Sequence, residues 1–415
     1  MANTHWTIYS DNESDRDKLF EQLLTGTGLP KAFDYLKDLK GGLFSQSEID
    51  RFIEEEERHD LKFLTPGSDQ HLNALSSGER KKALIKYLLN QENDFLVLDN
   101  PLDNLDTSSR QDLKGLMNKL SREVHLIQLI TRKADHFSFP SKWAVLEGNE
   151  LRVIEDLQHL DVEISPTTYD REVPGPLHPI APVSDPLVLI DKVSISYGDK
   201  PVLDQISWKL KSREFWQLSG PNGSGKTTML SLITGENPKA YGQEIILFGN
   251  KKGSGESVWE IKEKLGYFTP AMIDRFRGYH SLENMLISGL HDSIGLYVQP
   301  SKAEQELAQK WLVFLGMEDM AKRYFHELSL GQQRLIMCVR AMIKHPPLLI
   351  LDEPTAGLDD NSAALLVNLV NQIALSTDSC VVFVSHRKEP GLNPQFTYTL
   401  LPGIKGSTGK TTKGS

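Results

Sequence analysis

An internal repeat constrains the fold of this chain more than any other feature. Three short motifs recur in the same order, and they read Leu75-Ser76-Ser77-Gly78-Glu79, Leu96-Val97-Leu98-Asp99-Asn100-Pro101 and Asn104-Leu105-Asp106 in one copy and Leu328-Ser329-Leu330-Gly331-Gln332, Leu349-Ile350-Leu351-Asp352-Glu353-Pro354 and Gly357-Leu358-Asp359 in the other. From serine to strand-end aspartate there are 23 residues in each copy (76 to 99, 329 to 352), and the next aspartate follows after seven in each. Equal spacing of three motifs indicates a duplicated domain. A chain of 415 residues has room for two or three domains at about 150 residues each.

The stretch between the two copies differs in character from both of them. Residues 161–186 contain six prolines, and residues 150–186 contain eight acids and two arginines. Proline-rich segments favour extended, semi-rigid backbone, so we interpret 161–186 as an acidic linker. The predicted organisation is a first domain over 1–160, this linker, a second domain over 187–402 and a flexible Gly/Ser/Thr/Lys tail over 403–415.

Composition and charge exclude several classes of protein. The formal net charge of −10 argues against a general nucleic-acid binder. Two cysteines, Cys338 and Cys380, are too few for a secreted disulfide scaffold. The longest apolar run has seven residues (311–317), whereas a spanning helix needs about 20, so we expect no membrane span. Residues 1–10 do not resemble a signal peptide, and we expect a protein that is cytoplasmic or peripheral at the inner face of the membrane.

The second copy contains a phosphate-binding loop pattern, G-x-x-x-x-G-K-[ST], between a predicted strand over 215–218 and a predicted helix over 228–234. In that context the glycines let backbone N–H groups approach phosphate oxygens at a helix N-terminus. Lys226 is expected to reach the β- and γ-phosphates of a nucleotide, and Thr227 to offer its hydroxyl to Mg²⁺. The residues expected to contact ATP are Gly220, Pro221, Asn222, Gly223, Ser224, Gly225, Lys226, Thr227 and Thr228.

Acidic and imidazole side chains follow two apolar strands of the second copy. Asp352 and Glu353 come after the strand at 348–351, and His386 follows the strand at 381–384. Ligands of α/β sheets bind at such carboxyl ends of strands. We therefore expect Asp352 to contact Mg²⁺, Glu353 to polarise the attacking water and His386 to contact the γ-phosphate.

The order of these motifs resembles that of ATP-binding cassette (ABC) ATPases over residues 187–400, and more weakly over 5–140. The resemblance implies an α/β fold of two P-loop NTPase-like cassettes in tandem, ATPase activity with Mg²⁺, adenine stacking on Tyr197 and a role for Asp359 in communication across the nucleotide. Three stretches of the second copy read Gly253-Ser254-Gly255-Glu256-Ser257-Val258-Trp259-Glu260-Ile261-Lys262, Ile233-Thr234-Gly235 and Asp292-Ser293-Ile294-Gly295. In these stretches the chain is similar to one group of twin-cassette ABC ATPases, the molybdate-transport or photorepair-associated ATP-binding proteins. It departs from the family at 266–270, Gly-Tyr-Phe-Thr-Pro, where the glutamine that couples nucleotide state to membrane subunits is missing.

The first copy departs further, because residues 10–17 align with the phosphate-binding loop and contain no glycine. Four acids, Asp11, Glu13, Asp15 and Asp17, stand there instead, and they would repel phosphate. Asn100 aligns with the catalytic glutamate and Arg132 with the histidine. We expect this truncated cassette neither to bind nor to hydrolyse ATP by itself.

The first copy nevertheless retains the signature motif, Ser76, Ser77 and Gly78. In ABC ATPases the signature of one cassette closes over nucleotide held by the other. The resemblance therefore implies one composite site that combines the second P-loop, Glu353 and His386 with the first signature. This site forms either within one chain or across a homodimer, and the competing interpretation is that Ser76 only caps a helix.

The target of the ATPase is less constrained than the ATPase itself. The favoured hypothesis is the ATP-binding component of a transport system with membrane permease subunits as partners. One alternative is a soluble ABC ATPase acting on ribosomes or another macromolecule, against which the acidic linker argues. The other is a non-catalytic, ATP-gated scaffold, against which Glu353 and His386 argue.

Overall fold

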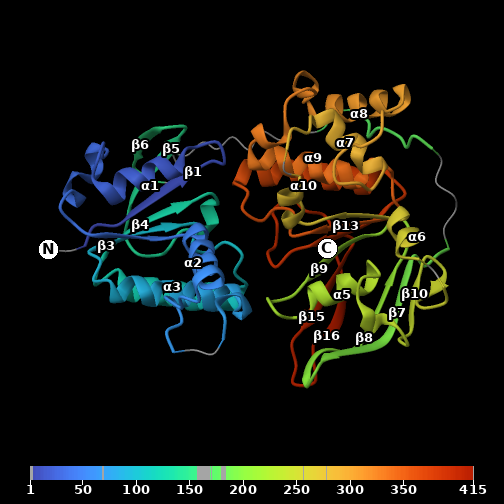
Figure 1. Ribbon diagram of the computed structural model, residues 1–415, viewed down its shortest axis with the longest axis horizontal. Coiled ribbons are helices and arrows are strands. Elements are labelled where there is room, and N and C mark those ends of the chain that lie inside the picture. Colours follow the sequence, from blue (N-terminus) through green and yellow to red (C-terminus); the bar gives the residue numbers. More distant parts are fainter. Residues whose placement is uncertain are drawn as a thin grey trace. The chain divides into compact units, whose positions relative to one another are not determined.

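The computed structural model describes residues 3–67, 70–156, 169, 171–178, 184–255, 257–276 and 278–414 (Figure 1). Internal contacts divide the chain into two units: Met1–Ile164 with Gly357–Asn361, and Ser165–Ala356 with Ser362–Ser415. Much of the predicted linker over 161–186 lies outside the described residues, so its character stays a prediction. Each unit is described by itself below.

The first unit is built on a six-stranded sheet of order β2-β3-β4-β1-β5-β6, parallel except for the final β5–β6 pair. Its elements are β1 (Trp6–Ser10), α1 (Arg16–Thr25), η1 (Lys31–Leu36), β2 (Gly41–Phe44), α2 (Gln46–His59), η2 (Leu72–Ala74), α3 (Ser77–Asn90), β3 (Phe95–Asp99), α4 (Thr107–Leu120), β4 (His125–Ile130), η3 (Lys133–Asp135), β5 (Lys142–Glu147) and β6 (Glu150–Ile154). Its central strands are short and almost entirely buried, and most of their residues are aliphatic or aromatic, as expected of parallel strands covered on both faces.

The second unit contains a six-stranded sheet of the corresponding order, β12-β13-β14-β9-β15-β16. Its elements are β7 (Val188–Tyr197), β8 (Lys200–Leu210), β9 (Phe215–Ser219), α5 (Lys226–Ile233), η5 (Pro238–Ala240), β10 (Ile245–Leu247), β11 (Asn250–Lys251), α6 (Val258–Glu263), β12 (Leu265–Phe268), η6 (Pro270–Arg275), α7 (Leu282–Leu290), α8 (Lys302–Leu315), η7 (Glu318–Met320), η8 (Phe325–Glu327), α9 (Leu330–Met342), β13 (Leu348–Asp352), α10 (Asp360–Ser376), β14 (Cys380–Val384), β15 (Phe396–Leu401) and β16 (Thr408–Lys413). The matching order agrees with the duplication inferred from motif spacing, and the α/β fold class is confirmed.

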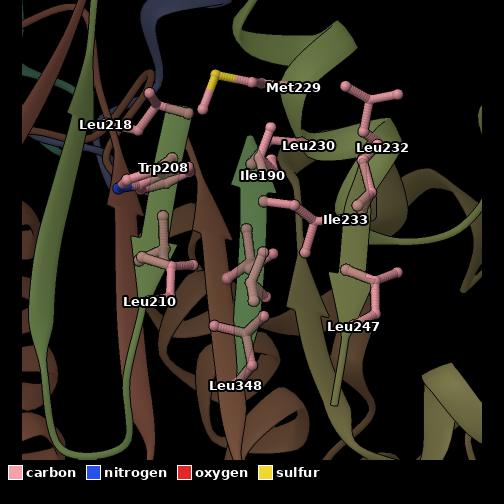
Figure 2. Close-up of a cluster of buried hydrophobic side chains, with 14 of the residues drawn as sticks. Ile190, Trp208, Leu210, Leu218, Met229, Leu230, Leu232, Ile233, Leu247 and Leu348 are labelled. Carbon is pink, nitrogen blue, oxygen red and sulfur yellow. The ribbon is translucent and has the colours of Figure 1, made fainter. Parts of the chain in front are cut away.

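A second sheet, antiparallel and of order β11-β10-β7-β8, distinguishes the second unit. Among the described residues, the first unit has no counterpart of it. Helix α5 packs its apolar side chains against this sheet and the larger one, and Figure 2 shows them beside Ile190, Trp208 and Leu218. The buried α5 residues are Met229, Leu230, Leu232 and Ile233. Burying such side chains contributes roughly 1.5–3 kcal/mol each, which fixes the helix that begins at Lys226.

The prediction of a flexible tail over 403–415 is wrong for the six residues Thr408–Lys413. Thr408–Lys413 forms strand β16, which pairs antiparallel with β15 from Phe396↔Lys413 to Leu401↔Thr408. Threonine favours extended backbone, and Gly409 leaves space for Tyr398, whose hydroxyl would lie only 1.8 Å from a Cβ at position 409. The second domain therefore extends past residue 402.

Candidate nucleotide-binding site

The carboxyl ends of three neighbouring strands form the edge at which the predicted site residues meet. Strand β14 lies between β13 and β9 and is parallel to both, with Val384 opposite Asp352 on one side and Leu218 on the other. Glu353 follows β13, His386 lies two residues past the end of β14, and Gly220 follows β9. Parallel pairing thus brings the P-loop together with the acidic pair and the histidine, both of which follow it by more than 100 residues in the sequence.

The P-loop joins β9 to α5 through a backbone that requires glycine. Gly225 is the N-cap of α5 and has φ 94°, and a Cβ there would lie 2.7 Å from Leu203 Cδ2. Lys226, the first helical residue, donates from Nζ to the carbonyl oxygens of Gly220 (2.8 Å) and Pro221 (3.2 Å). The loop residues Asn222 and Gly223 and the hydroxyl-bearing Thr227 are exposed, whereas Ser224 is buried and Thr228 is partly buried. The turn thus presents the N-terminus of α5, its cation and its hydroxyl at the strand edge.

Asp352 lies partly buried at the end of β13 and is the carboxylate expected to face Mg²⁺. Burial, and then repulsion from Glu353, raise the pKa of Asp352 to about 6, against the opposing effects of Lys226 and a hydrogen bond from Tyr267. The Tyr267 hydroxyl, on β12, donates to Asp352 Oδ2 at 3.5 Å. Hard oxygen donors such as this carboxylate and the Thr227 hydroxyl are the ligands Mg²⁺ prefers, so the residues present fit that ion.

Glu353 and His386 form a contact within hydrogen-bond distance. His386 Nδ1 lies 3.0 Å from Glu353 Oε2, and Arg387 Nε donates to His386 Nε2 at 3.5 Å. With Nε2 accepting, Nδ1 carries the proton and donates to the carboxylate. Glu353 has φ 48°, a backbone strain that recurs at functional sites. The pair holds one carboxylate oxygen of Glu353 in a fixed direction.

Tyr197 ends β7 in the antiparallel sheet and leaves much of its ring exposed, with 46% of the residue accessible to solvent. Its hydroxyl oxygen accepts a hydrogen bond from Asn237 Nδ2 (2.9 Å), and Lys239 Nζ lies 5.6 Å from the ring centroid. An exposed ring beside the P-loop helix is what stacking on a base requires.

Known proteins with similar sequences show the family to which the chain belongs. The family model for ABC transporters matches residues 203–356. The ABC transporter ATP-binding protein ModF of Escherichia coli (strain K12) is 36% identical over 339 residues, which cover 79% of this chain and 69% of that protein. This chain is an ABC ATPase.

Other relatives and one solved structure also match this ABC ATPase. An uncharacterized ABC transporter ATP-binding protein of Schizosaccharomyces pombe (strain 972 / ATCC 24843), C323.04, is 29% identical over 343 residues, covering 79% of this chain and 68% of that protein. A chain from a model of ribosome-bound archaeal Pelota and ABCE1 covers 99% of this chain and 75% of its own length with a TM-score of 0.64. Its sequence identity of 14% makes that likeness one of fold alone.

In the first unit of the ABC ATPase, residues 10–17 correspond to the P-loop, and several of them form hydrogen bonds and an ion pair within the unit. The Asp11 carboxylate accepts hydrogen bonds from the Glu13 N–H (3.0 Å), the Ser14 N–H (2.8 Å) and the Ser14 hydroxyl (2.7 Å). Arg16, in the place of Lys226, forms an ion pair with Asp99, in the place of Asp352, at 3.1 Å. Asp15, in the place of Gly225, has φ −81°, so the backbone also differs from a P-loop.

The register of the first sheet corrects the residue equivalent to His386. Asp99 pairs with Leu129 as Asp352 pairs with Val384, and two residues further on stand Thr131 and His386. Thr131, not Arg132, is therefore the counterpart, and its N–H (2.9 Å) and hydroxyl (3.1 Å) donate to Asn100 Oδ1. Motif alignment missed this because it matched Thr131-Arg132 to Ser385-His386 as dipeptides, whereas the strand register fixes the count.

The retained signature begins helix α3 in the first unit. Ser76 is the N-cap, and it forms a reciprocal capping box with Glu79, as Ser329 does with Gln332 on α9. A Cβ on Gly78 would lie 3.3 Å from Ser109 Oγ, and one on Gly331 would lie 2.4 Å from Ser362 Oγ, the corresponding serine. The two signatures thus have one local geometry, and the capping role of Ser76 is present in the structure. Ser77 Oγ donates to the Asn104 carbonyl (3.1 Å).

Asp359 lies in Gly357–Asn361, the segment that contacts assign to the first unit. Its carboxylate accepts a hydrogen bond from the Asn12 N–H at 2.8 Å, and its own N–H donates to Asn12 Oδ1 at 2.6 Å. Asp359 is thereby held by two reciprocal hydrogen bonds.

Three residues of the second unit that touch predicted site residues escaped sequence reasoning: Tyr267, Arg387 and Asn237. Tyr267 lies in the segment 266–270, which lacks the family's glutamine. The sequence pattern of a strand shows which face a side chain is on, but not that the Tyr267 hydroxyl reaches Asp352. Arg387 follows His386 directly and could have been found by extending that motif. The contacts of Asn237 could not be predicted, because they require β7 and α5 to lie close together in the folded chain.

Proposed function

We propose that this ABC ATPase hydrolyses ATP at one composite site, made of the P-loop and acidic strand end of the second unit and the signature of the first. The observation that carries the proposal is the contrast between the two strand edges. One combines a P-loop with the Glu353–His386 pair, whereas the other holds the Arg16–Asp99 ion pair. The first unit then contributes its signature rather than a second nucleotide site.

Each residue of the second unit has a defined task in this proposal. The α5 N-terminus and Lys226 bind the phosphates, and the Tyr197 ring stacks on adenine. Glu353 accepts hydrogen bonds from the attacking water, while His386 keeps the other carboxylate oxygen engaged and so orients the base. Bound Mg²⁺, held by Asp352 and Thr227, would neutralise charge on the β- and γ-phosphates.

In this proposal Ser76 completes the site from the first unit. Its hydroxyl and the neighbouring N–H groups at the start of α3 supply donors to the γ-phosphate once the signature closes over it. Its hydroxyl now donates to Glu79 (2.6 Å), so closure exchanges that bond for one to phosphate. The first unit's own P-loop counterpart binds no nucleotide, because the Asp11-centred loop and the Arg16–Asp99 pair use the groups that would hold phosphate.

A complementation experiment tests whether the site forms within one chain. Lys226→Ala protein keeps its first signature, and Ser76→Arg protein keeps its P-loop. If the site forms within one chain, each variant and their equimolar mixture are inactive in an ATPase assay. Recovery of about a quarter or more of wild-type activity on mixing would place the site between two chains and overturn the intramolecular proposal.

We further propose that the ATPase is the ATP-binding component of a transport system at the cytoplasmic face of a membrane. The name of the E. coli relative, an ABC transporter ATP-binding protein, supports a transport role. Among the described residues no helix has both the length and the apolarity to cross a bilayer. Purification from mild-detergent extracts of membranes tests this: a stoichiometric integral membrane protein is expected, and copurification with ribosomes alone would favour the macromolecular alternative.

A cavity of the second unit offers a route from such a partner to the site. It has a volume of about 260 Å³, lies beside β12, α6, η6 and α9, and is lined in part by Tyr267, Thr269 and Arg340. Because Tyr267 also donates to Asp352, a segment seated in this cavity would act on the Mg²⁺-binding carboxylate without the missing glutamine.

A further inference from the structure

Asn237 connects the aromatic ring expected to bind the base with the helix expected to bind the phosphates. It follows α5 in the chain and is almost completely buried, with 4% of its surface exposed. Its Nδ2 donates to Tyr197 Oη on β7 (2.9 Å) and to Ser231 Oγ on α5 (2.9 Å). One side-chain amide thus spans the antiparallel sheet and the P-loop helix.

Further hydrogen bonds fix the direction of this amide. The Asn237 carbonyl oxygen Oδ1 accepts from the Lys239 N–H at 3.0 Å, which caps the short helix η5. The Asn237 N–H donates to the Ser231 carbonyl at 3.1 Å. Because Oδ1 accepts the hydrogen bond from Lys239, the NH₂ group of the amide faces Tyr197 and Ser231 and donates to both.

The Tyr197 ring is constrained on a face as well as at its hydroxyl. Lys239 Nζ lies over the ring at 5.6 Å from the centroid, a distance at which a cation is attracted to an aromatic face. Solvent reaches 46% of the Tyr197 residue. Without Asn237, an exposed tyrosine at the end of a strand would lose little by rotating away.

We propose that Asn237 is a positioning residue that holds Tyr197 at a fixed place relative to the P-loop helix, so that one nucleotide can meet both the ring and the loop. This inference rests on the adenine-stacking role proposed for Tyr197. It adds that Asn237 holds the ring in the orientation needed for stacking before the nucleotide binds. Preorganisation raises affinity by removing the cost of ordering the ring on binding. It acts on the base-dependent part of nucleotide affinity and leaves phosphate binding unchanged.

The test compares ADP with pyrophosphate, a ligand without a base, by calorimetric titration of the full chain. Tyr197→Phe keeps the ring and the helix cap but removes the oxygen that Asn237 reaches. We expect ADP to bind about three- to tenfold more weakly, with pyrophosphate affinity unchanged. Asn237→Ala should weaken ADP similarly, and the double variant no further, because both changes remove the same hydrogen bond between Asn237 and Tyr197. Asn237→Asp, whose carboxylate accepts from the tyrosine hydroxyl and still caps η5, should restore most of the affinity.

Three outcomes contradict the inference, and Tyr197→Ala separates the first two of them. If Tyr197→Ala weakens ADP while Tyr197→Phe binds it like the wild type, the ring stacks on the base without help from Asn237, and only the positioning role fails. If Tyr197→Ala leaves ADP affinity unchanged, the ring does not hold the base and the proposed adenine role fails with it. Equal weakening of ADP and pyrophosphate by Tyr197→Phe would show a general structural effect and also contradict the proposal.

Discussion

Arg16 Nη1 lies 3.1 Å from Asp99 Oδ1 in the first unit, at the positions that Lys226 and Asp352 occupy in the second. The first unit has therefore kept a cation beside the strand-end acid while losing the glycines of the loop. Desolvation raises the pKa of the Asp99 carboxyl, and the nearby Arg16 guanidinium opposes that rise. Arg16 and Asp99 thus pair with each other, whereas we propose that the corresponding residues of the second unit serve the nucleotide.

The equivalent aspartates should give opposite results when neutralised. Asp352→Asn should lower ATPase activity by about 100-fold or more, because it removes the carboxylate expected to hold Mg²⁺. Asp99→Asn should change turnover by less than about twofold, since the first unit holds no nucleotide of its own in this account. Steady-state phosphate release by the two purified variants measures both effects. A comparable loss of activity in Asp99→Asn would contradict the assignment of a single working site.

Glu353→Gln should keep ATP bound while turnover stops. The amide has nearly the shape of the carboxylate and can remain beside His386, but it no longer draws a proton from water. We expect phosphate release to fall by about 100-fold or more, with ATP affinity changed by less than about threefold. Filter retention of labelled ATP together with an ATPase assay measures both quantities. Unchanged turnover would remove Glu353 from the role of base.

Asp352 should make the nucleotide-free protein less stable as pH rises. Its pKa of about 6 in the folded chain exceeds the ordinary value of 3.8, so between these values the folded state binds more protons than the unfolded state. Stability then falls as pH rises through this window, by linkage. In the presence of a chelator, Asp352→Asn should therefore be more stable than the wild type at pH 7.5, with a free energy of unfolding higher by about 1–3 kcal/mol. The difference should narrow toward pH 5, and a constant difference from pH 7.5 to pH 5 would argue against the raised pKa.

Tyr267→Phe should weaken the response of the ATPase to Mg²⁺ without unfolding the protein. The variant keeps the ring on β12 and removes the hydroxyl that donates to Asp352. We expect the half-saturating Mg²⁺ concentration to rise about two- to fivefold, as loss of one modest hydrogen bond implies. Mn²⁺ binding followed by electron paramagnetic resonance gives a second readout that does not depend on turnover.

Tyr398→Phe is the matched control for that experiment. Tyr398 is a buried tyrosine of the same sheet, and its hydroxyl donates to the Ser207 carbonyl at 3.0 Å. It should lose a similar hydrogen bond yet leave the metal response at its wild-type value. Equal shifts in the two variants would mean that Tyr267 acts only through general stability.

The nucleotide-site motifs of the second unit could be predicted from the sequence, because each consists of residues that are adjacent in the chain. The glycines around Lys226 admit few conformations, and the acids after Leu351 mark a strand end whatever the rest of the chain does. The strands and the helix flanking the P-loop lie where the apolar runs placed them, at β9, β13, β14 and α5. What could not be read were contacts between elements, such as those of Tyr267 and Asn237, because these depend on sheet order and register.

The internal repeat extends to two further features of the fold, strand β16 and Thr131. Strand β16 is the counterpart of β6, since each forms an antiparallel hairpin with the strand before it. Composition alone made 403–415 look unstructured, whereas the repeat could have predicted the hairpin. Thr131 was passed over for Arg132 because short motifs were matched by residue type, and a one-residue offset is invisible without the ladder of paired strands.

The two signature serines provide the most direct test of the composite site. Ser76 and Ser329 both cap helices through the same capping box, so Ser76→Arg and Ser329→Arg should each lose about 1 kcal/mol of stability and serve as controls for one another. The account predicts that Ser76→Arg abolishes ATP hydrolysis while leaving ATP binding intact, and that Ser329→Arg retains activity within about threefold of the wild type. Loss of hydrolysis in Ser329→Arg with activity retained in Ser76→Arg would contradict it, and would place the signature of the second unit over the nucleotide instead.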